Sequence, residues 1–234
     1  MAVSRKLITS LKRDLESHAD PAYGRRMQSY TKSSLPLYGV RTPVLRRLAT
    51  GRFRQHPFRG FGDWRDTVLA LWRGARYREE KACAVFMCES TVYRQYQALE
   101  ALPVYEEMIV TGAWWDLVDP VATHCIRHLL TNHPGKISRV LIKWSRDDDI
   151  WKRRAAILTQ VRLKNKTDKE LLFKCIQPSI GSGEFFLQKA IGWALRDYAT
   201  NDFSSVEKFV DLHRHRLSKL SLREALKNRD KYRR

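Results

Sequence analysis

The stretch from Thr111 to Leu130 reads TGAWWDLVDPVATHCIRHLL, and it decides how the rest of the chain is interpreted. Two adjacent tryptophans and two carboxylates, Asp116 and Asp119, interrupt an apolar pattern with helical spacing. Residues four apart share one face of a helix, so Trp115 and Asp119 would project together. The same apolar line continues through Ala122, Ile126 and Leu129. A carboxylate in that line costs free energy unless it is paired or used.

The same stretch has a second, purely structural interpretation. Asp119 followed by Pro120 is also typical of a helix start, with the aspartate as N-cap and the proline at the first helical position. A proline disfavours helical geometry at the residue before it, so a helix running through both residues is one of two alternatives. Trp114 and Trp115 would then be core residues of the preceding turn. The sequence leaves both alternatives open.

Helical periodicity continues on both sides of this stretch, and no segment alternates as a β-strand does. Thr42-Pro43 has the residues of an N-cap and first helical position. Short connections containing Pro, Gly, Asp or Asn separate the segments. Besides the Trp–Asp stretch, helices are predicted at 3–18, 22–33, 43–52, 62–73, 78–89, 92–102, 103–111, 135–145, 148–162, 167–177, 184–199, 203–212 and 219–228.

This pattern predicts an all-α fold. About a dozen short helices, pairing roughly every 35–45 residues, indicate an α-solenoid of HEAT-like helical pairs. No low-complexity linker divides the chain, so we expect a single domain over residues 1–234 with a concave, basic groove.

The charge indicates a polyanionic partner. Lys and Arg number 44 against 25 Asp and Glu, a formal net charge of +19. Such an excess favours nucleic acid, with an anionic membrane surface as the second candidate. The basic residues are spread along the chain, which favours a folded basic surface over a disordered arm. The segment 41–59 carries six arginines and no acidic residue, typical of a solvated face but also compatible with contacts to a DNA backbone.

The four cysteines have no C-x-x-C spacing, and each has apolar neighbours. Free cysteines in such settings are usually small core residues, which predicts a reduced, intracellular protein. The N-terminus lacks a secretory apolar region, and no apolar run reaches 18 residues. We therefore expect a cytoplasmic or nucleoid-associated protein that does not enter the membrane.

Two further polar residues interrupt apolar helical faces. Arg154 lies on the apolar line of segment 148–162 and needs an anionic partner, because a guanidinium does not readily lose its charge. That partner is either a structural carboxylate or a phosphate bound by the planar fork. Arg153 beside it is interpreted as a surface charge. Trp193 borders the apolar stripe of segment 184–199 with two cations on its face, Lys189 and Arg196, which suits either a boundary tryptophan or base stacking.

Other catalytic chemistries have little support. His124 and His128 are four residues apart, but no third ligand lies near them in the sequence, so no metal site is predicted. Glycine-rich phosphate loops, a Ser–His–Asp order and zinc-deaminase motifs do not occur. No cofactor is expected.

Four motifs carry a resemblance to a known family. They are YGVRTP at 38–43, WWDLVD at 114–119, WKRRAAI at 151–157 and FFLQKAIGWALR at 185–196. In order and spacing the chain resembles the AlkD-like family of HEAT-repeat DNA glycosylases, over most of its length. The second and fourth motifs together are specific, and either alone is less so.

The resemblance implies a monofunctional glycosylase that excises positively charged N3- or N7-alkylated purines from duplex DNA in base excision repair. It implies Asp119 as the catalytic carboxylate, Trp115 and Trp193 as aromatic walls, and Arg154 as a phosphate contact. Together with the surface charge, it indicates DNA contacts at Tyr30, Arg41, Thr42, Arg153, Lys189 and Arg196. A shallow groove, a monomer and the absence of a lyase step are also expected.

Two rival functions stay open at this point. One is a non-catalytic protein of the same architecture that binds damaged or branched DNA, although such relatives are expected to lack the Trp–Asp–Trp set. The other is a HEAT scaffold for acidic proteins or RNA, which explains the charge but not the polar residues on apolar faces.

Overall fold

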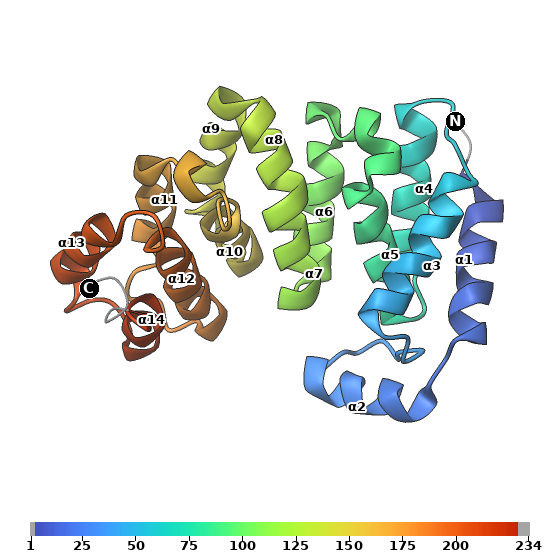
Figure 1. Ribbon diagram of the computed structural model, residues 1–234, viewed down its shortest axis with the longest axis horizontal. Helices are drawn as coiled ribbons and strands as arrows, with labels where there is room; N and C mark the ends of the chain where they lie inside the picture. The colour runs from blue at the N-terminus through green and yellow to red at the C-terminus, as the bar shows by residue number, and fades with distance from the viewer. Residues whose placement is uncertain (1–2, 229–234) are drawn as a thin grey trace. The chain divides into compact units, whose positions relative to one another are not determined.

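The computed structural model describes residues 3–228, and within that range the chain forms helices and connecting turns without any β-strand (Figure 1). The predicted all-α class is confirmed, and successive helices pack against one another as in an α-solenoid. The chain divides into two compact units, Met1–Met108 and Ile109–Arg234. The single domain and the concave basic groove expected from the sequence stay predictions.

The N-terminal unit contains five helices and two 3₁₀ turns before the division. They are α1 (Arg5–Ser17), α2 (Pro21–Thr31), α3 (Thr42–Arg54), α4 (Phe61–Arg73), α5 (Arg78–Glu89), η1 (Thr91–Tyr96) and η2 (Leu99–Ala101). Helix α6 (Leu102–Gly112) follows, and the division falls within it.

The C-terminal unit begins with a helix that is interrupted by a π-helical turn. Its elements are α7 (Trp115–Pro120), the π turn η3 (Val121–Ile126), α8 (Arg127–Asn132), α9 (Pro134–Trp144), α10 (Ile150–Leu158), η4 (Lys164–Lys166), α11 (Lys169–Ile176), η5 (Gln177–Ser179), α12 (Phe185–Tyr198), α13 (Phe203–His213) and α14 (Lys219–Ala225).

In the N-terminal unit, α1 packs on α3, and α3 packs on α5. Leu7, Leu11 and Leu15 recur every four residues along α1, and all three are buried. Ser4 caps the helix by accepting a hydrogen bond from the Leu7 amide. The apolar stripe of α1 thus fixes its inner face and leaves the opposite face to solvent.

The segment before α3 is held by a buried carboxylate of α5. Glu79 accepts hydrogen bonds from three consecutive backbone amides, those of Tyr38, Gly39 and Val40, at 3.1, 2.8 and 3.3 Å. Gly39 has a φ of +87°, and a Cβ there would meet the Asp20 carbonyl oxygen at 2.0 Å, so only glycine fits. Burial raises the pKa of Glu79, and the backbone amides oppose that rise.

In the C-terminal unit, α10 lies against α9, α11 and α12, and α12 packs closely on α14 (Figure 1). Gly192 permits this last approach, because a Cβ at that position would come within 2.5 Å of the Glu224 Cβ. The contact brings charged side chains of α12 and α14 together at the edge of the unit.

Two local predictions are wrong. Helix α3 begins at Thr42 and not at Pro43; Arg41 is its N-cap residue and no side chain caps it. The segment predicted as a helix at 92–102 forms the 3₁₀ turns η1 and η2, with non-helical geometry at Tyr93. Within residues 3–228, no helix has the length and apolar character needed to cross a membrane.

Candidate functional site

Asp119 lies inside a continuous helical segment, which decides between the two alternatives left open by the sequence. Asp119 and Pro120 are the last residues of α7, and the chain passes directly into the π turn η3. Pro120 has no N–H to donate and its ring crowds the preceding turn, so a wider turn relieves the local geometry. Trp115 and Asp119, four residues apart in α7, therefore project from one face.

The Asp119 carboxylate forms a bidentate ion pair with Arg154 of α10. The Nε and Nη2 groups of Arg154 donate to the two carboxylate oxygens, each at 2.7 Å. Both residues are buried, with exposed fractions of 8% for Asp119 and 5% for Arg154. Each charge thus has its partner, as burial requires.

The third donor group of Arg154 binds the backbone. Its Nη1 donates to the Phe186 carbonyl at 2.5 Å, near the start of α12. Three helices, α7, α10 and α12, are therefore joined through one guanidinium. The sequence pattern left a structural carboxylate and a phosphate open as partners of Arg154, and the resemblance implied a phosphate; in this structure its guanidinium binds Asp119 and the Phe186 carbonyl.

An aromatic cluster adjoins this pair. The ring centre of Phe186 lies 5.0 Å from the ring centres of both Trp114 and Trp151, and the ring centres of the two tryptophans are 6.1 Å apart. The Arg154 guanidinium lies 5.9 Å from the centre of the Phe186 ring. These rings lower the local dielectric constant, which strengthens electrostatic interactions at Asp119.

Burial raises the pKa of the Asp119 carboxyl above its ordinary value, and the nearby Asp116 adds to that rise. The hydrogen bonds and positive charge of Arg154 oppose it. The protonation of Asp119 therefore depends on whether Arg154 stays in place. Such a buried, coupled carboxyl is a frequent feature of functional sites.

The two tryptophans predicted as aromatic walls differ from the core tryptophans. Trp115 and Trp193 are half-buried, whereas Trp64 and Trp72 in the N-terminal unit are fully enclosed. Trp193 lies on α12, the helix whose Phe186 carbonyl binds Arg154. Both rings thus keep part of their surface available to a ligand.

The cations that flank Trp193 have a common anionic partner. Lys189 lies 3.1 Å from Glu224 of α14, and Arg196 makes a short ion pair with the same carboxylate. These bonds lower the pKa of Glu224, with the Arg196 contact contributing most. The spacing of Lys189 and Arg196 was visible in the sequence, but Glu224 was not anticipated.

The remaining predicted DNA contacts lie in two places. Arg153 donates to the Ser179 hydroxyl and the Pro178 carbonyl, so part of its fork has a structural use. Tyr30, Arg41 and Thr42 belong to the N-terminal unit and are exposed, with Arg41 5.1 Å from the ring centre of Tyr23. Their roles in DNA binding stay predictions.

The paired histidines have local partners. His124 Nδ1 lies 3.1 Å from the Pro120 carbonyl, and His128 contacts the Asn132 side chain. Across residues 3–228, no group of three or more His, Cys, Asp or Glu residues is arranged to hold a metal ion.

Comparison with known proteins identifies the family. The model of the DNA alkylation repair enzyme family matches residues 11–228. This chain belongs to that family. A solved structure described as a predicted DNA alkylation repair enzyme from Enterococcus faecalis is similar over 90% of this chain and 96% of its own, with a TM-score of 0.79 and 26% sequence identity. No curated protein matches the sequence.

Membership confirms the resemblance inferred from the four motifs and connects the chain with the repair of alkylated DNA. The sequence pointed to Asp119 and Arg154 separately, and the structure joins them in one ion pair. Trp114, Trp151 and Phe186 lay within the quoted motifs but were not singled out. The sequence feature that could have indicated them is an aromatic residue two or three positions before a charged residue in each of three motifs: before Asp116, before Arg154 and before Lys189.

Proposed function

We propose that this member of the DNA alkylation repair enzyme family is a monofunctional DNA glycosylase. It hydrolyses the N-glycosidic bond of positively charged N3- or N7-alkylated purines in duplex DNA and starts base excision repair. The observation that carries the proposal is the Asp119 carboxylate, which is buried in an apolar helix face and oriented by the Nε and Nη2 groups of Arg154. A purely structural carboxylate would be more simply replaced by an apolar residue.

The substrate supplies much of the driving force. Alkylation at N3 or N7 places a positive charge on the purine, so the bond to the sugar is already weakened. The base leaves with the bonding electron pair, and the sugar develops oxocarbenium character. Asp119 stabilises that charge and orients a water molecule. The water oxygen bonds to the anomeric carbon, its proton passes to solvent, and free base and an abasic site result.

Arg154 acts in this mechanism as a positioning residue. Its fork fixes both oxygens of Asp119, and its bond to the Phe186 carbonyl ties the pair to α12. Its charge also opposes the rise in the pKa of Asp119 and so favours the ionised carboxylate. In this proposal Arg154 positions Asp119, whereas the resemblance implied a phosphate contact for it.

Trp115 and Trp193 supply aromatic faces for the cationic lesion. Each such contact contributes about 0.5–2 kcal/mol, and a neutral base would gain less. This selects charged adducts without a tight pocket around the base. The basic surface, including Lys189 and Arg196, attracts the DNA backbone. The mechanism uses no cofactor and no lysine Schiff base.

The decisive experiment measures release of free base from duplexes containing N7-methylguanine or N3-methyladenine, under single-turnover conditions. Wild-type protein is expected to release base, and Asp119→Asn to be slower by about 100- to 1000-fold, as when one charge-stabilising group is removed. Asp116→Asn is the matched control, because it removes the same charge from the same helix outside the Arg154 pair. It is expected to stay within severalfold of wild type.

Two outcomes would contradict the proposal. Salt-sensitive DNA binding without base release from either substrate would favour a non-catalytic damage-binding protein. Equal loss in Asp119→Asn and Asp116→Asn, with both variants folded, would remove Asp119 from its assigned role.

A further inference from the structure

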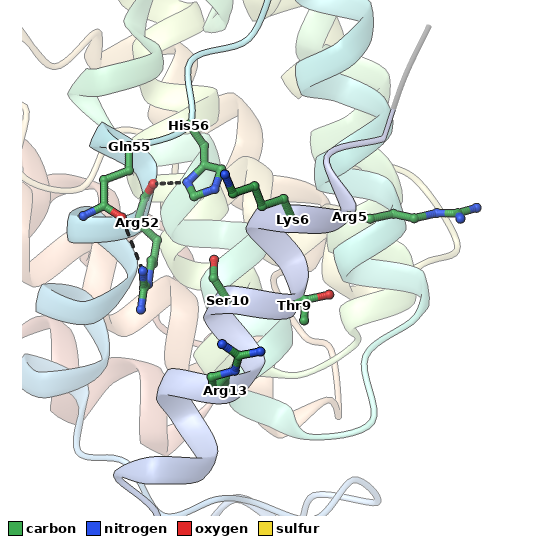
Figure 2. Close-up of a pocket in the computed structure, with 8 residues that line it drawn as sticks. All are labelled: Arg5, Lys6, Thr9, Ser10, Arg13, Arg52, Gln55 and His56. Atoms are coloured by element: carbon green, nitrogen blue, oxygen red, sulfur yellow. Dashed lines mark hydrogen bonds between the residues drawn. The ribbon is translucent and has the colours of Figure 1, made fainter.

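A basic pocket lies in the N-terminal unit between α1 and the end of α3 (Figure 2). Its volume is about 500 Å³. Its lining consists of polar and basic side chains: Arg5, Lys6, Thr9, Ser10 and Arg13 from α1, and Arg52, Gln55 and His56 from α3 and the residues just after it. These lining residues include no Asp or Glu and no Phe, Tyr or Trp.

Three of the lining cations form no ion pair with any residue that the structure describes. Within residues 3–228, no carboxylate lies within ion-pair distance of Arg5, Lys6 or Arg13, and all three are exposed. Arg52 differs, because both oxygens of Asp14 accept from its fork at 2.6 Å. The pocket lining thus carries an excess of positive charge from the exposed face of α1, which the Asp14 carboxylate offsets in part, because Arg13 also contributes to the lowered pKa of Asp14.

His56 lines the same pocket. Its Nδ1 lies 2.8 Å from the Arg52 carbonyl, and since a carbonyl only accepts, Nδ1 carries the proton. Its Nε2 is buried and has no hydrogen-bond partner. In Figure 2, the Lys6 side chain extends from α1 toward the His56 ring.

We propose that this pocket is a second DNA-binding site, which takes phosphates of the duplex backbone. Phosphate oxygens accept hydrogen bonds from Arg5, Lys6 and Arg13, and from the Thr9 hydroxyl. The DNA backbone is the source of phosphate because the chain carries a formal net charge of +19 and belongs to a DNA repair family.

The lining also distinguishes the duplex backbone from other phosphate ligands. Nucleotides and single strands are usually held by large aromatic side chains that stack on their bases, and the lining of this pocket contains no Phe, Tyr or Trp. Small metabolites are usually enclosed by apolar walls. Here the cations are exposed, as suits a strand that passes along the surface. The site requires DNA as partner but does not require that the protein release a base.

The test compares two triple variants in binding to undamaged duplex DNA across a range of salt concentrations. The pocket variant is Arg5→Gln/Lys6→Gln/Arg13→Gln. The matched control is Lys136→Gln/Arg139→Gln/Lys143→Gln, which removes three exposed cations from α9 and lowers the net charge by the same amount. Circular dichroism and thermal melting establish that both variants are folded.

The slope of log Kd against log salt is expected to become shallower in the pocket variant by about 0.9 for each lost phosphate contact. Affinity near physiological salt is expected to fall about tenfold relative to the control, as loss of two contacts would give. The charge-retaining variant Arg5→Lys/Arg13→Lys should keep the wild-type slope. Equal slopes in the pocket variant and the α9 control would overturn the proposal.

A local readout identifies the source of the phosphate. The ring resonance of His56, assigned through His56→Gln, is followed by NMR during titration with undamaged duplex or with inorganic phosphate at matched ionic strength. We expect the duplex to shift it to saturation and millimolar phosphate to leave it near its starting position. Saturation by phosphate without a response to duplex, or no response to either, would contradict binding of the DNA backbone here.

These results are independent of the proposed glycosylase. A chain that releases no alkylated base but shows the pocket-dependent salt slope retains the second DNA site and loses the catalytic proposal. A chain that releases base normally while both triple variants bind alike retains the glycosylase and loses this site.

Discussion

Glu79 in the N-terminal unit and Asp119 in the C-terminal unit are both buried carboxylates within helices, with exposed fractions of 5% and 8%. Burial raises the pKa of each. Their partners differ in kind. Glu79 accepts from three consecutive backbone amides, whereas Asp119 is held by one charged side chain, Arg154.

The comparison shows why burial alone does not identify a functional carboxylate. The amides bound by Glu79 are fixed by the chain and need an acceptor in the folded state, so this carboxylate has a structural use. Asp119 instead shares its helix face with the half-buried Trp115, and its partner is another buried charge. An arrangement with that desolvation cost is expected where the charge itself is used.

The largest effect on stability is expected from Arg154→Ala. It leaves the Asp119 carboxylate buried without its charged partner, which costs about 3–5 kcal/mol in the free energy of unfolding. Without the guanidinium the pKa of Asp119 rises further, so the loss is greatest at neutral pH and shrinks as acid protonates the carboxyl. Urea unfolding at several pH values measures this.

Arg153→Ala is the control for that variant, since it removes the neighbouring arginine, whose hydrogen bonds go to the neutral groups of Ser179 and Pro178. Its cost is expected near 1 kcal/mol. Equal losses in the two variants would mean that the Asp119–Arg154 pair is an ordinary surface-like contact.

Glu79→Gln tests the structural side of the comparison. Glutamine keeps one acceptor oxygen but cannot serve all three amides, so we expect a loss of about 1–3 kcal/mol in unfolding free energy. The exposed Glu100→Gln should cost less than about 0.5 kcal/mol. Base release per folded molecule should stay within twofold of wild type in both. A selective catalytic loss in Glu79→Gln would place this carboxylate among the functional groups.

The pH dependence of base release tests how Arg154 affects the proposed catalytic carboxylate, Asp119. In the proposed mechanism the active form of Asp119 is the carboxylate, so the rate should rise with pH through its raised pKa and fall in acid. In Arg154→Gln the opposing positive charge is gone, and the acid limb should move to higher pH. Arg153→Gln should keep the wild-type profile. Single-turnover rates, corrected for spontaneous base loss, measure these profiles. An acid limb that stays at the wild-type pH in Arg154→Gln would contradict the coupling between Arg154 and Asp119.

Helices and the residues that share a helix face could be predicted from the sequence, because they depend on local periodicity. Contacts between residues far apart in the sequence could not. The spacing of Trp115 and Asp119 predicted that they share one helix face. The charge of Arg154 predicted an anionic partner but did not identify it. Thirty-five positions separate Arg154 from Asp119, so spacing could not pair them. Glu79, in the sequence REEK, has the composition of an exposed first helical turn, and only the fold shows it turned toward the 38–40 amides.

The conflict between Pro120 and the helical pattern was also beyond local rules. Proline disfavours the helical alternative, yet the apolar residues on both sides of the turn are buried and the chain stays helical. The wider π turn η3 accommodates the proline. Glu224 was missed for a related reason, since it lies 28 positions beyond Arg196 on a separate helix. Its contact with α12 depends on Gly192, whose small size allows α14 to approach.

The smallest predicted effect concerns that carboxylate. Glu224→Gln keeps the packing beside Gly192 but removes the charge shared by Lys189 and Arg196, which lie on the α12 face with Trp193. If these cations contact DNA, their release should tighten binding about two- to fivefold at moderate salt and steepen the salt slope by up to about 0.9 per added phosphate. The exposed Glu184→Gln, which removes the same charge at the start of α12, is the control. Equal gains in the two variants would assign Lys189 and Arg196 to holding α14 in place, because only a general change in net charge would then be acting on the DNA.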